Sequence, residues 1–128
     1  MIYCLAYPSQ KPRWFYAEAI KEYEKRLGRF CKVQRMMRFD AASERDLIIA
    51  VSPYGKYLSS EEMAGRFLSA EHGAVSRVIF TSKLDSFARY DEKWALTSVN
   101  IPDDLQMVLL LEQIYRAQKI MHNEPYHK

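Results

Sequence analysis

Short apolar runs recur along this chain, and each is stopped by a polar or proline-containing turn. The run from Ile2 to Tyr7 ends at Pro8, the run from Leu47 to Val51 ends at Ser52, and a third spans Arg77 to Thr81. Runs of this length without polar alternation are typical of strands buried on both faces, as in a parallel sheet. The pattern therefore predicts a parallel sheet at the centre of the fold.

Helical segments separate these runs. Pro12 suits the first turn of a helix and Gly28 its C-terminal cap, and a spacing of four residues predicts one apolar face between them, formed by Phe15, Ala19, Tyr23 and Leu27. Ser59 and Glu62 form a capping-box pattern that predicts a second helix over residues 60–71. Residues 30–39 are predicted to be a further, less regular strand, and residues 94–101 another strand because of their apolar content. Strands that alternate with helices predict one α/β domain over residues 1–128, with a mostly parallel sheet of five or six strands and flanking helices.

The most apolar helical segment lies near the C-terminus, over residues 104–121, with Pro102, Asp103 and Asp104 predicted to cap its positive end. Its apolar residues form one full face and part of a second: Met107, Leu110, Leu111, Ile114, Ala117 and Met121, then Leu105, Val108 and Leu109. A helix that is apolar on more than one side is buried on more than one side. One side is expected to pack on the chain's own sheet and the other on a second copy, which predicts a homodimer through this helix.

The composition limits the class of protein. The chain has 128 residues, of which 48% are hydrophobic, and this is enough for one domain with its own core. A formal net charge of +3 permits an anionic partner such as RNA but does not require one. Cys4 and Cys31 lie in apolar runs without metal-binding spacing, so we expect both to be reduced. Since no apolar run approaches the ~20 residues that span a bilayer and no signal-peptide pattern is present, we expect a cytoplasmic protein without membrane association.

Ligands of parallel sheets usually bind at the carboxyl ends of the strands. These ends are expected at residues 7–8, 52–56, 81–85 and 100–104. Basic and aromatic residues nearby fit either an RNA-binding surface or an ordinary solvated one: Lys11, Arg13, Arg35, Arg38 and Lys83, with Trp14 and Tyr16. His122 and His127 have no third ligand near them, so no metal site is expected. Because no phosphate-binding glycine loop or nucleophile motif is present, the residues by themselves do not define a reaction.

The last twenty residues, LLLEQIYRAQKIMHNEPYHK, closely resemble the C-terminus of the ribosomal RNA large-subunit methyltransferase H family. The specific part is the stretch from Glu112 to Ala117 and the ending from Asn123 to His127. Residues 47–56 resemble the family's central strand and turn, and residues 94–97 with 101–102 resemble its last strand and the proline after it. The segment from Glu22 to Leu27 fits as well, so the resemblance covers most of the chain.

The resemblance implies a SPOUT-class methyltransferase with a C-terminal trefoil knot in an α/β fold, acting as a homodimer. It implies methyl transfer from S-adenosylmethionine to N3 of a pseudouridine in 23S ribosomal RNA, free or in the assembled ribosome. Tyr126 and His127 would then be catalytic, with His127 removing a proton from the base. The residues expected to line the cofactor site are Val51, Thr81, Ser82, Asn100, Ile101, Pro102, Asp103, Asp104 and Leu105.

The chain departs from the family at this expected cofactor site. Thr81 to Asp85 stand where the family has a glycine-rich turn, and glycine allows close backbone approach to a ligand. Asp103 and Asp104 occupy a stretch in which the family carries a histidine, and an arginine is replaced by Met107. Acids in this stretch are expected to repel RNA phosphates. The connections near Asp40 and from Ser82 to Trp94 are also short. Two hypotheses therefore stay open: an active methyltransferase with a diverged cofactor loop, or a knotted dimer that has lost catalysis and acts as an RNA-binding or interaction protein.

Overall fold

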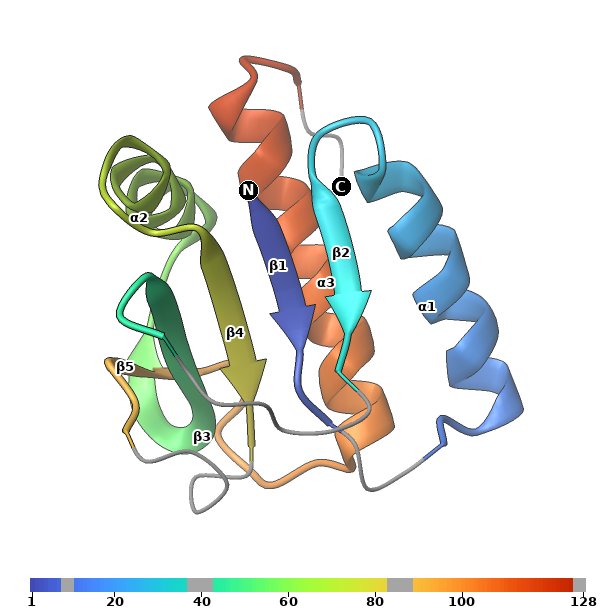
Figure 1. The fold of residues 1–128 in the computed structure, drawn as a ribbon. Coiled ribbons are helices and arrows are strands. Elements are labelled where there is room, and N and C mark those ends of the chain that lie inside the picture. Colours follow the sequence, from blue (N-terminus) through green and yellow to red (C-terminus); the bar gives the residue numbers. More distant parts are fainter. Residues whose placement is uncertain (8–10, 37–42, 83–88, 126–128) are drawn as a thin grey trace.

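The computed structural model describes residues 1–7, 11–36, 43–82 and 89–125. Five strands and three helices follow one another along these residues (Figure 1). In chain order they are β1 (Ile2–Leu5), α1 (Trp14–Leu27), β2 (Lys32–Arg35), β3 (Asp46–Tyr57), α2 (Ser60–His72), β4 (Arg77–Thr81), β5 (Glu92–Ala95) and α3 (Asp103–Met121).

The strands form one sheet in the order β2-β1-β4-β3-β5, and every described strand pair is parallel. The predicted parallel α/β architecture with five strands is therefore confirmed. Since the paired strands run in the same direction, β1, β2 and β4 end at one edge of the sheet, at the bottom of Figure 1, where β3 bends before it continues to Tyr57. Both α1 and α3 run back from this edge toward the amino ends of the strands.

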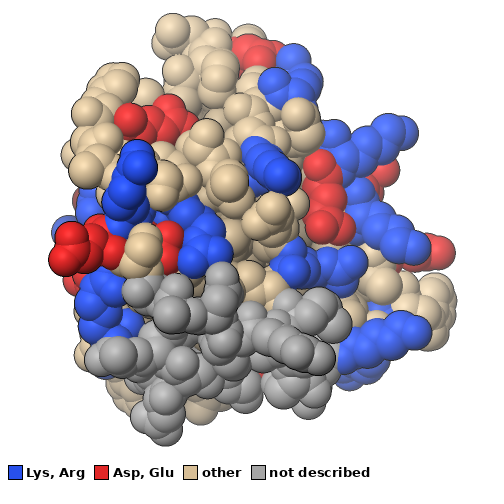
Figure 2. Space-filling model, in the orientation of Figure 1, with Lys and Arg blue, Asp and Glu red and all other residues tan. Residues whose placement is uncertain are grey.

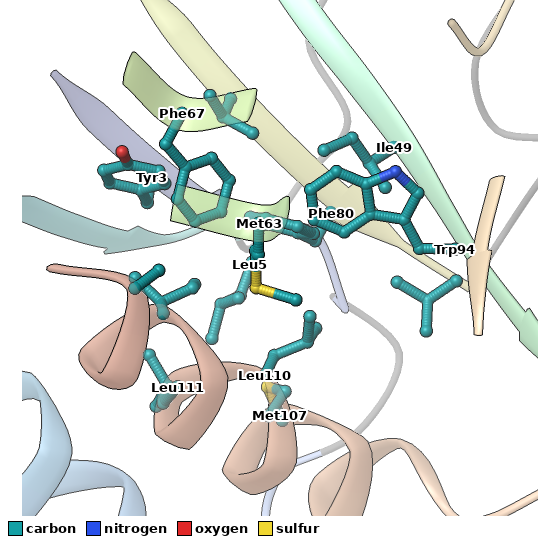
Figure 3. Close-up of a cluster of buried hydrophobic side chains, with 14 of the residues drawn as sticks. Tyr3, Leu5, Ile49, Met63, Phe67, Phe80, Trp94, Met107, Leu110 and Leu111 are labelled. Atoms are coloured by element: carbon teal, nitrogen blue, oxygen red, sulfur yellow. The ribbon is translucent and has the colours of Figure 1, made fainter. Parts of the chain in front are cut away.

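The three helices pack on the same face of the sheet. The main buried cluster takes apolar side chains from α1, α2 and α3 and from alternate positions of the strands. Four aromatic rings stand at its centre (Figure 3), and neighbouring centroids lie 4.9–6.3 Å apart: Tyr3, Phe67, Phe80 and Trp94. Leu110 and Leu111 of α3 lie opposite this group and are almost fully buried. Burying a side chain of this size contributes roughly 1.5–3 kcal/mol, so this layer supplies most of the driving force for folding.

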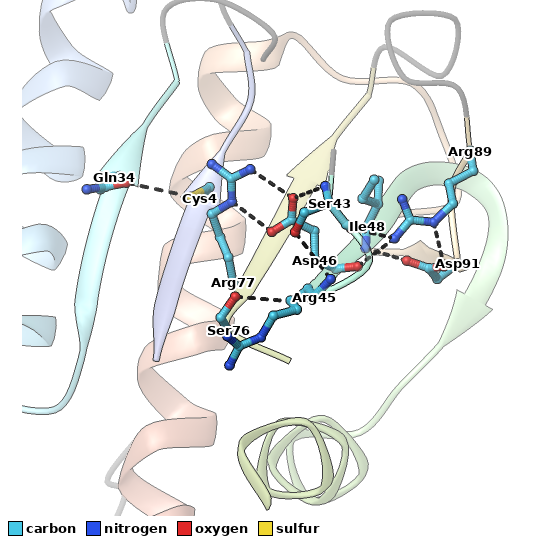
Figure 4. A network of polar contacts seen from close by, with 10 residues as sticks. All are labelled: Cys4, Gln34, Ser43, Arg45, Asp46, Ile48, Ser76, Arg77, Arg89 and Asp91. Carbon is cyan, nitrogen blue, oxygen red and sulfur yellow. Dashed lines mark hydrogen bonds and ion pairs between the residues drawn. The ribbon is translucent and has the colours of Figure 1, made fainter. Parts of the chain in front are cut away.

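The other face of the sheet has a smaller buried cluster, Cys4, Ala6, Met36, Ile48 and Ile79, to which none of the described helices contributes. A polar network lies on this face (Figure 4). Arg77 binds both carboxylate oxygens of buried Asp46, at 3.0 and 2.8 Å, and this hydrogen-bonded ion pair lowers the pKa of Asp46. Arg89 donates to the backbone oxygens of Ser43 and Asp46. The network therefore ties the start of β3 to β4 and to the chain that enters β5.

Several predicted boundaries were wrong. The strand predicted over residues 94–101 is β5, which ends at Ala95, because the chain then turns and Thr97 Oγ1 donates to the Val99 carbonyl at 2.6 Å. The turn predicted at residues 52–56 is part of β3, which continues to Tyr57 with a shift of register against β5. The strand predicted over residues 30–39 is shorter within the described residues, Lys32–Arg35, while residues 37–39 lie outside them. In α1 the predicted apolar residue Phe15 is exposed, and Ile20 is buried in its place.

Gly55 makes the register shift of β3 possible. A Cβ atom at this position would lie 2.5 Å from the carbonyl carbon of Trp94 and 2.8 Å from that of Lys93. Backbone atoms cannot rotate away as a side chain can, so β5 would have to move. We expect Gly55→Ala to lower the free energy of unfolding by ~1–3 kcal/mol, the usual cost of overpacking, as measured by urea denaturation.

Gly65, in the exposed part of α2, provides the matched control. A Cβ there would meet nothing within 4 Å, and replacing an exposed helical glycine by alanine stabilises a helix by ~1 kcal/mol. Gly65→Ala should therefore stabilise the protein while Gly55→Ala destabilises it. Equal effects of the two substitutions would show that β5 does not need this close approach.

Candidate functional site

The residues predicted to bind a cofactor lie at the carboxyl edge of the sheet. Thr81 ends β4 and is paired with Ala50 of β3, and both Thr81 and Val51 are buried. Ser82, which directly follows β4, donates a hydrogen bond from Oγ to Oδ1 of Asp103 at 3.0 Å. Two segments that are 21 residues apart are thereby joined at the N-terminus of α3.

Asp104 is held by a second contact to this edge. Asp104 is 3% exposed, and its carboxylate receives two hydrogen bonds from the Arg13 guanidinium, at 2.8 and 3.0 Å, and one from the Arg13 backbone N–H at 3.2 Å. The Leu105 backbone N–H donates to it at 2.9 Å. These bonds, led by that from the Arg13 side chain, lower the pKa of Asp104 to about 2. The carboxylate that was expected to repel RNA is therefore already neutralised by Arg13.

A third contact joins the end of β1 to α3. The buried hydroxyl of Tyr7 donates to Oε1 of Gln106. Burial, with a smaller contribution from the charge on Asp103, raises the pKa of Tyr7 well above its usual value, so this phenol stays neutral. Neither Tyr7 nor Gln106 was among the predicted site residues. The sequence indicated Tyr7 only by its position at a strand end. No sequence signal links it to Gln106, which is 99 positions away.

The other predicted residues of this edge are more accessible. Asn100 and Pro102 are exposed, while Ile101, Asp103 and Leu105 are half-buried. Pro102 takes the N-cap position of α3 without a side-chain hydrogen bond, and Asp103 and Asp104 stand in the first turn, where acids favour the helix dipole. Tyr126 and His127, like Lys83 and Asp85 of the altered glycine turn, lie outside the described residues.

The start of the C-terminal tail is fixed at the opposite end of the molecule. Asn123 takes a left-handed conformation with φ 55°, and the Glu124 N–H donates to the Lys119 carbonyl at 2.8 Å. This arrangement is a common way for a helix to end. The Glu124 carboxylate is bound by Arg29 at 2.7 Å and by Lys119 at 3.5 Å. The chain thus leaves α3 beside the C-terminal end of α1, near the amino ends of the strands (Figure 1).

Two cavities adjoin β5, and none of the residues predicted to bind a cofactor lines them. One of about 120 Å³ lies between Tyr57, Met63, Leu96 and Leu109, and one of about 360 Å³ includes Lys56, Arg66 and Glu92. Arg66 and Glu92 already form an ion pair at 2.5 Å. The first cavity is smaller than a typical small-molecule site, which occupies roughly 300–1,000 Å³.

The described residues contain no group of three or more His, Cys, Asp or Glu side chains that could hold a metal ion. None of the helices in these residues is long and apolar enough to cross a membrane.

Comparison with protein families gives a match over residues 34–127, to the family described as predicted SPOUT methyltransferase. The matched region contains β3, β4, β5 and α3 and therefore the whole edge at which Ser82 and Asp103 meet.

Curated relatives match nearly the whole chain. A ribosomal RNA large subunit methyltransferase H 1 from Thermoanaerobacter sp. is 34% identical over 122 residues, which cover 89% of this chain and 90% of the relative. Ribosomal RNA large subunit methyltransferase H from Deinococcus radiodurans is 34% identical over 139 residues, covering 92% and 93%. The protein of the same name from Clostridium beijerinckii is 33% identical over 143 residues, covering 87% and 89%.

Proposed function

The chain belongs to the SPOUT methyltransferase family, and on this premise we propose that it transfers a methyl group from S-adenosylmethionine to N3 of a pseudouridine in 23S ribosomal RNA. The observation that carries the proposal is the likeness over nine-tenths of the chain to relatives named as ribosomal RNA methyltransferases. The family's trefoil knot belongs to the same proposal.

The carboxyl edge of the sheet suits such a cofactor. Ile101 and Leu105, which are half-buried, offer apolar surface for an adenine ring, and the Asp103 carboxylate suits an ammonium group. Val51, Thr81, Ser82, Asn100 and Pro102 would contribute mainly backbone groups, while Asp104, held by Arg13, would position the first turn of α3. When bound, S-adenosylmethionine supplies an electrophilic methyl group on a sulfonium. The protein's own tasks are then to orient the base and to remove the N3 proton, for which neutral His127 is the proposed acceptor beside Tyr126.

The tail is proposed to act on the partner subunit's site, because it cannot reach its own. Helix α3 has 19 residues and is therefore ~28 Å long at a rise of 1.5 Å per residue. Glu124 is bound at the far end of α3 from Asp103. The three residues from Glu124 to His127 span at most ~11 Å when fully extended. A second copy, arranged so that the tail end of one protomer meets the cofactor edge of the other, would complete the site.

The homodimer through α3 is part of the proposal, and the structure identifies the residues with which to test it. Leu110 and Ile114 are buried within the protomer, so a charge there would unfold the chain rather than separate two copies. Leu105 and Leu109 are half-buried on the same side of α3. We expect light scattering to give a dimer for the native chain and a folded monomer of about 15 kDa for Leu109→Lys, because an unpaired charge in an apolar interface costs several kcal/mol. A Leu109→Lys variant that remains dimeric would place the interface elsewhere.

The proposed reaction is tested by incubating the protein with S-adenosylmethionine and large ribosomal subunits that lack the modification. Mass spectrometry of the digested RNA should show one N3-methylated pseudouridine per subunit. Calorimetric titration with S-adenosylmethionine tests the cofactor separately. The second candidate function is that of a catalytically inactive protein that binds RNA or another partner. The Ser82–Asp103 hydrogen bond favours it, because Ser82 has a side chain where the family has glycine. Absence of both cofactor binding and methyl transfer would support this second function.

A further inference from the structure

Basic and aromatic side chains gather where α1 and α3 end, at the amino edge of the sheet. We call this group the basic-aromatic patch. Its cationic members are Lys25, Arg26, Arg29, Lys32 and Lys119, and its ring members are Tyr23, Phe30, Tyr115 and His122. Its members come from α1 and the chain that follows it, from Lys32 at the start of β2, and from α3 and its C-cap His122.

The rings of the patch form a continuous set of contacts. Phe30 lies 4.8 Å from the His122 ring and 6.3 Å from Tyr115, which in turn lies 6.3 Å from Tyr23. Phe30, Tyr115 and Tyr23 are half-buried, whereas His122 is exposed. Nδ1 of His122 is 2.8 Å from the Gln118 carbonyl oxygen, to which it donates, and this bond fixes the orientation of the imidazole. His122 is therefore an oriented, exposed ring that rests on an aromatic support.

Cations surround these rings. The Arg29 guanidinium lies 4.2 Å from the centre of Phe30, and Lys119 and Arg26 lie 5.9 Å from Tyr115 and Tyr23. Among the residues that the structure describes, two carboxylates contact the patch: Glu22 binds Arg26, and Glu124 binds both Arg29 and Lys119. Lys25 and Lys32 are exposed, and within the described ranges neither has an ion-pair partner. Figure 2 shows Lys and Arg side chains along the flank that α1 forms. The patch therefore keeps a positive surplus.

We propose that the basic-aromatic patch binds the ribosomal RNA strand beside the methylated nucleotide, with its cations on phosphates and His122 stacked on an unpaired base. This rests on the proposed function, because it takes the substrate to be ribosomal RNA. Proteins that hold single-stranded RNA combine a positive track along the backbone with exposed rings on which bases stack, and both features occur here.

The position of the patch agrees with this role. Glu124, from which the tail with Tyr126 and His127 departs, is itself bound to Arg29 and Lys119 of the patch. The patch that is proposed to hold RNA therefore lies beside the point at which the tail, proposed to act on the base, leaves the fold. If the tail reaches the partner's cofactor edge, the patch lies beside that edge as well. RNA bound to one protomer would therefore present its base to the other.

The test reverses two charges that have no partner within the described residues. Lys25→Glu with Lys32→Glu removes two proposed phosphate contacts, and Arg45→Glu with Lys56→Glu, also exposed, is the charge-matched control. With large ribosomal subunits as the substrate, the first variant should have a KM for the subunits that is about tenfold higher than that of the native chain. Its kcat and its Kd for S-adenosylmethionine should be unchanged. Filter binding to a 23S RNA fragment should show a salt dependence smaller by about 1.4 in log–log slope, since each single-strand phosphate contact contributes ~0.7.

Stacking of an RNA base on His122 is tested with a second pair of variants. His122→Phe keeps a ring and should bind RNA like the native chain, while His122→Ala should bind roughly tenfold more weakly. Equal RNA affinities of the two charge variants would overturn the proposal, as would loss of the dimer in the Lys25/Lys32 variant alone, which would make the patch a contact between copies. If the native chain transfers no methyl group, the proposed function fails, but filter binding still decides on the patch.

Discussion

Removal of residues 125–128 is expected to lower methyl transfer at least a hundredfold while cofactor binding and thermal stability hardly change. The expected size follows from the loss of a general base, which contributes ~10²–10⁴-fold. Stability should persist because the contacts that end α3 involve residues up to Glu124, including its ion pair with Arg29. Single-turnover transfer to large ribosomal subunits measures the first quantity, and calorimetry with S-adenosylmethionine measures the second. Undiminished transfer by the truncated chain would remove Tyr126 and His127 from the mechanism.

Mixed dimers can show on which subunit the tail acts. One protomer lacks residues 125–128, and the other carries Ser82→Trp, a side chain large enough to fill the candidate cofactor site. Each homodimer should be inactive. If the tail acts on the partner subunit, co-expressed mixed dimers contain one complete site, made of the truncated chain's cofactor edge and the tail of the Ser82→Trp chain, and should recover up to half of the native rate. A tail that acts on its own subunit would leave the mixed dimers inactive.

Local sequence signals predicted the elements of this fold well where a residue pattern is typical of a single structure. The capping box of Ser59 and Glu62 starts α2, with both of its hydrogen bonds formed, and Gly28 ends α1. The continuation of β3 through Ser52–Tyr57 was not predictable in this way. It depends on how closely Gly55 approaches the backbone of β5, and Gly55 also fits the turn that the sequence favoured.

The candidate site was predictable as an edge of the sheet but not as a set of contacts. Strand ends located Thr81, Ser82 and Asp103 near one another, since parallel strands finish together. The partners that fix this edge come from distant segments: Arg13 lies 91 positions from Asp104, and Tyr7 lies 99 from Gln106. A sequence shows the charge of Asp104 but not the guanidinium that neutralises it, so the expectation that this acid repels RNA was incomplete.

The ion pair between Arg13 and Asp104 should dominate the stability of this edge. Arg13→Met leaves a buried carboxylate with only backbone donors, from residue 13 and from Leu105. Removing one partner of a buried pair leaves an uncompensated charge, so Arg13→Met should destabilise the protein, although less than in a fully buried pair because the Arg13 side chain is itself 52% exposed. Arg29→Met, which breaks the more exposed pair with Glu124, is the matched control and should have a clearly smaller effect. Urea denaturation at pH 7 measures both.

The dependence on pH distinguishes this ion pair from a general packing defect. The pKa of Asp104 is about 2 in the folded protein, against an ordinary value of 3.8. A depressed carboxyl pKa gives stability that is fully present above the unfolded value and is lost as pH falls toward the folded one. The difference in unfolding free energy between the native chain and Asp104→Asn should thus be constant above pH 5 and shrink between pH 4 and pH 2. A difference that stays the same down to pH 2 would mean that Asp104 acts through packing. Because the pair with Arg13 holds Asp104 in the first turn of α3, directly after Asp103, breaking the pair by Asp104→Asn or by Arg13→Met should also weaken binding of S-adenosylmethionine.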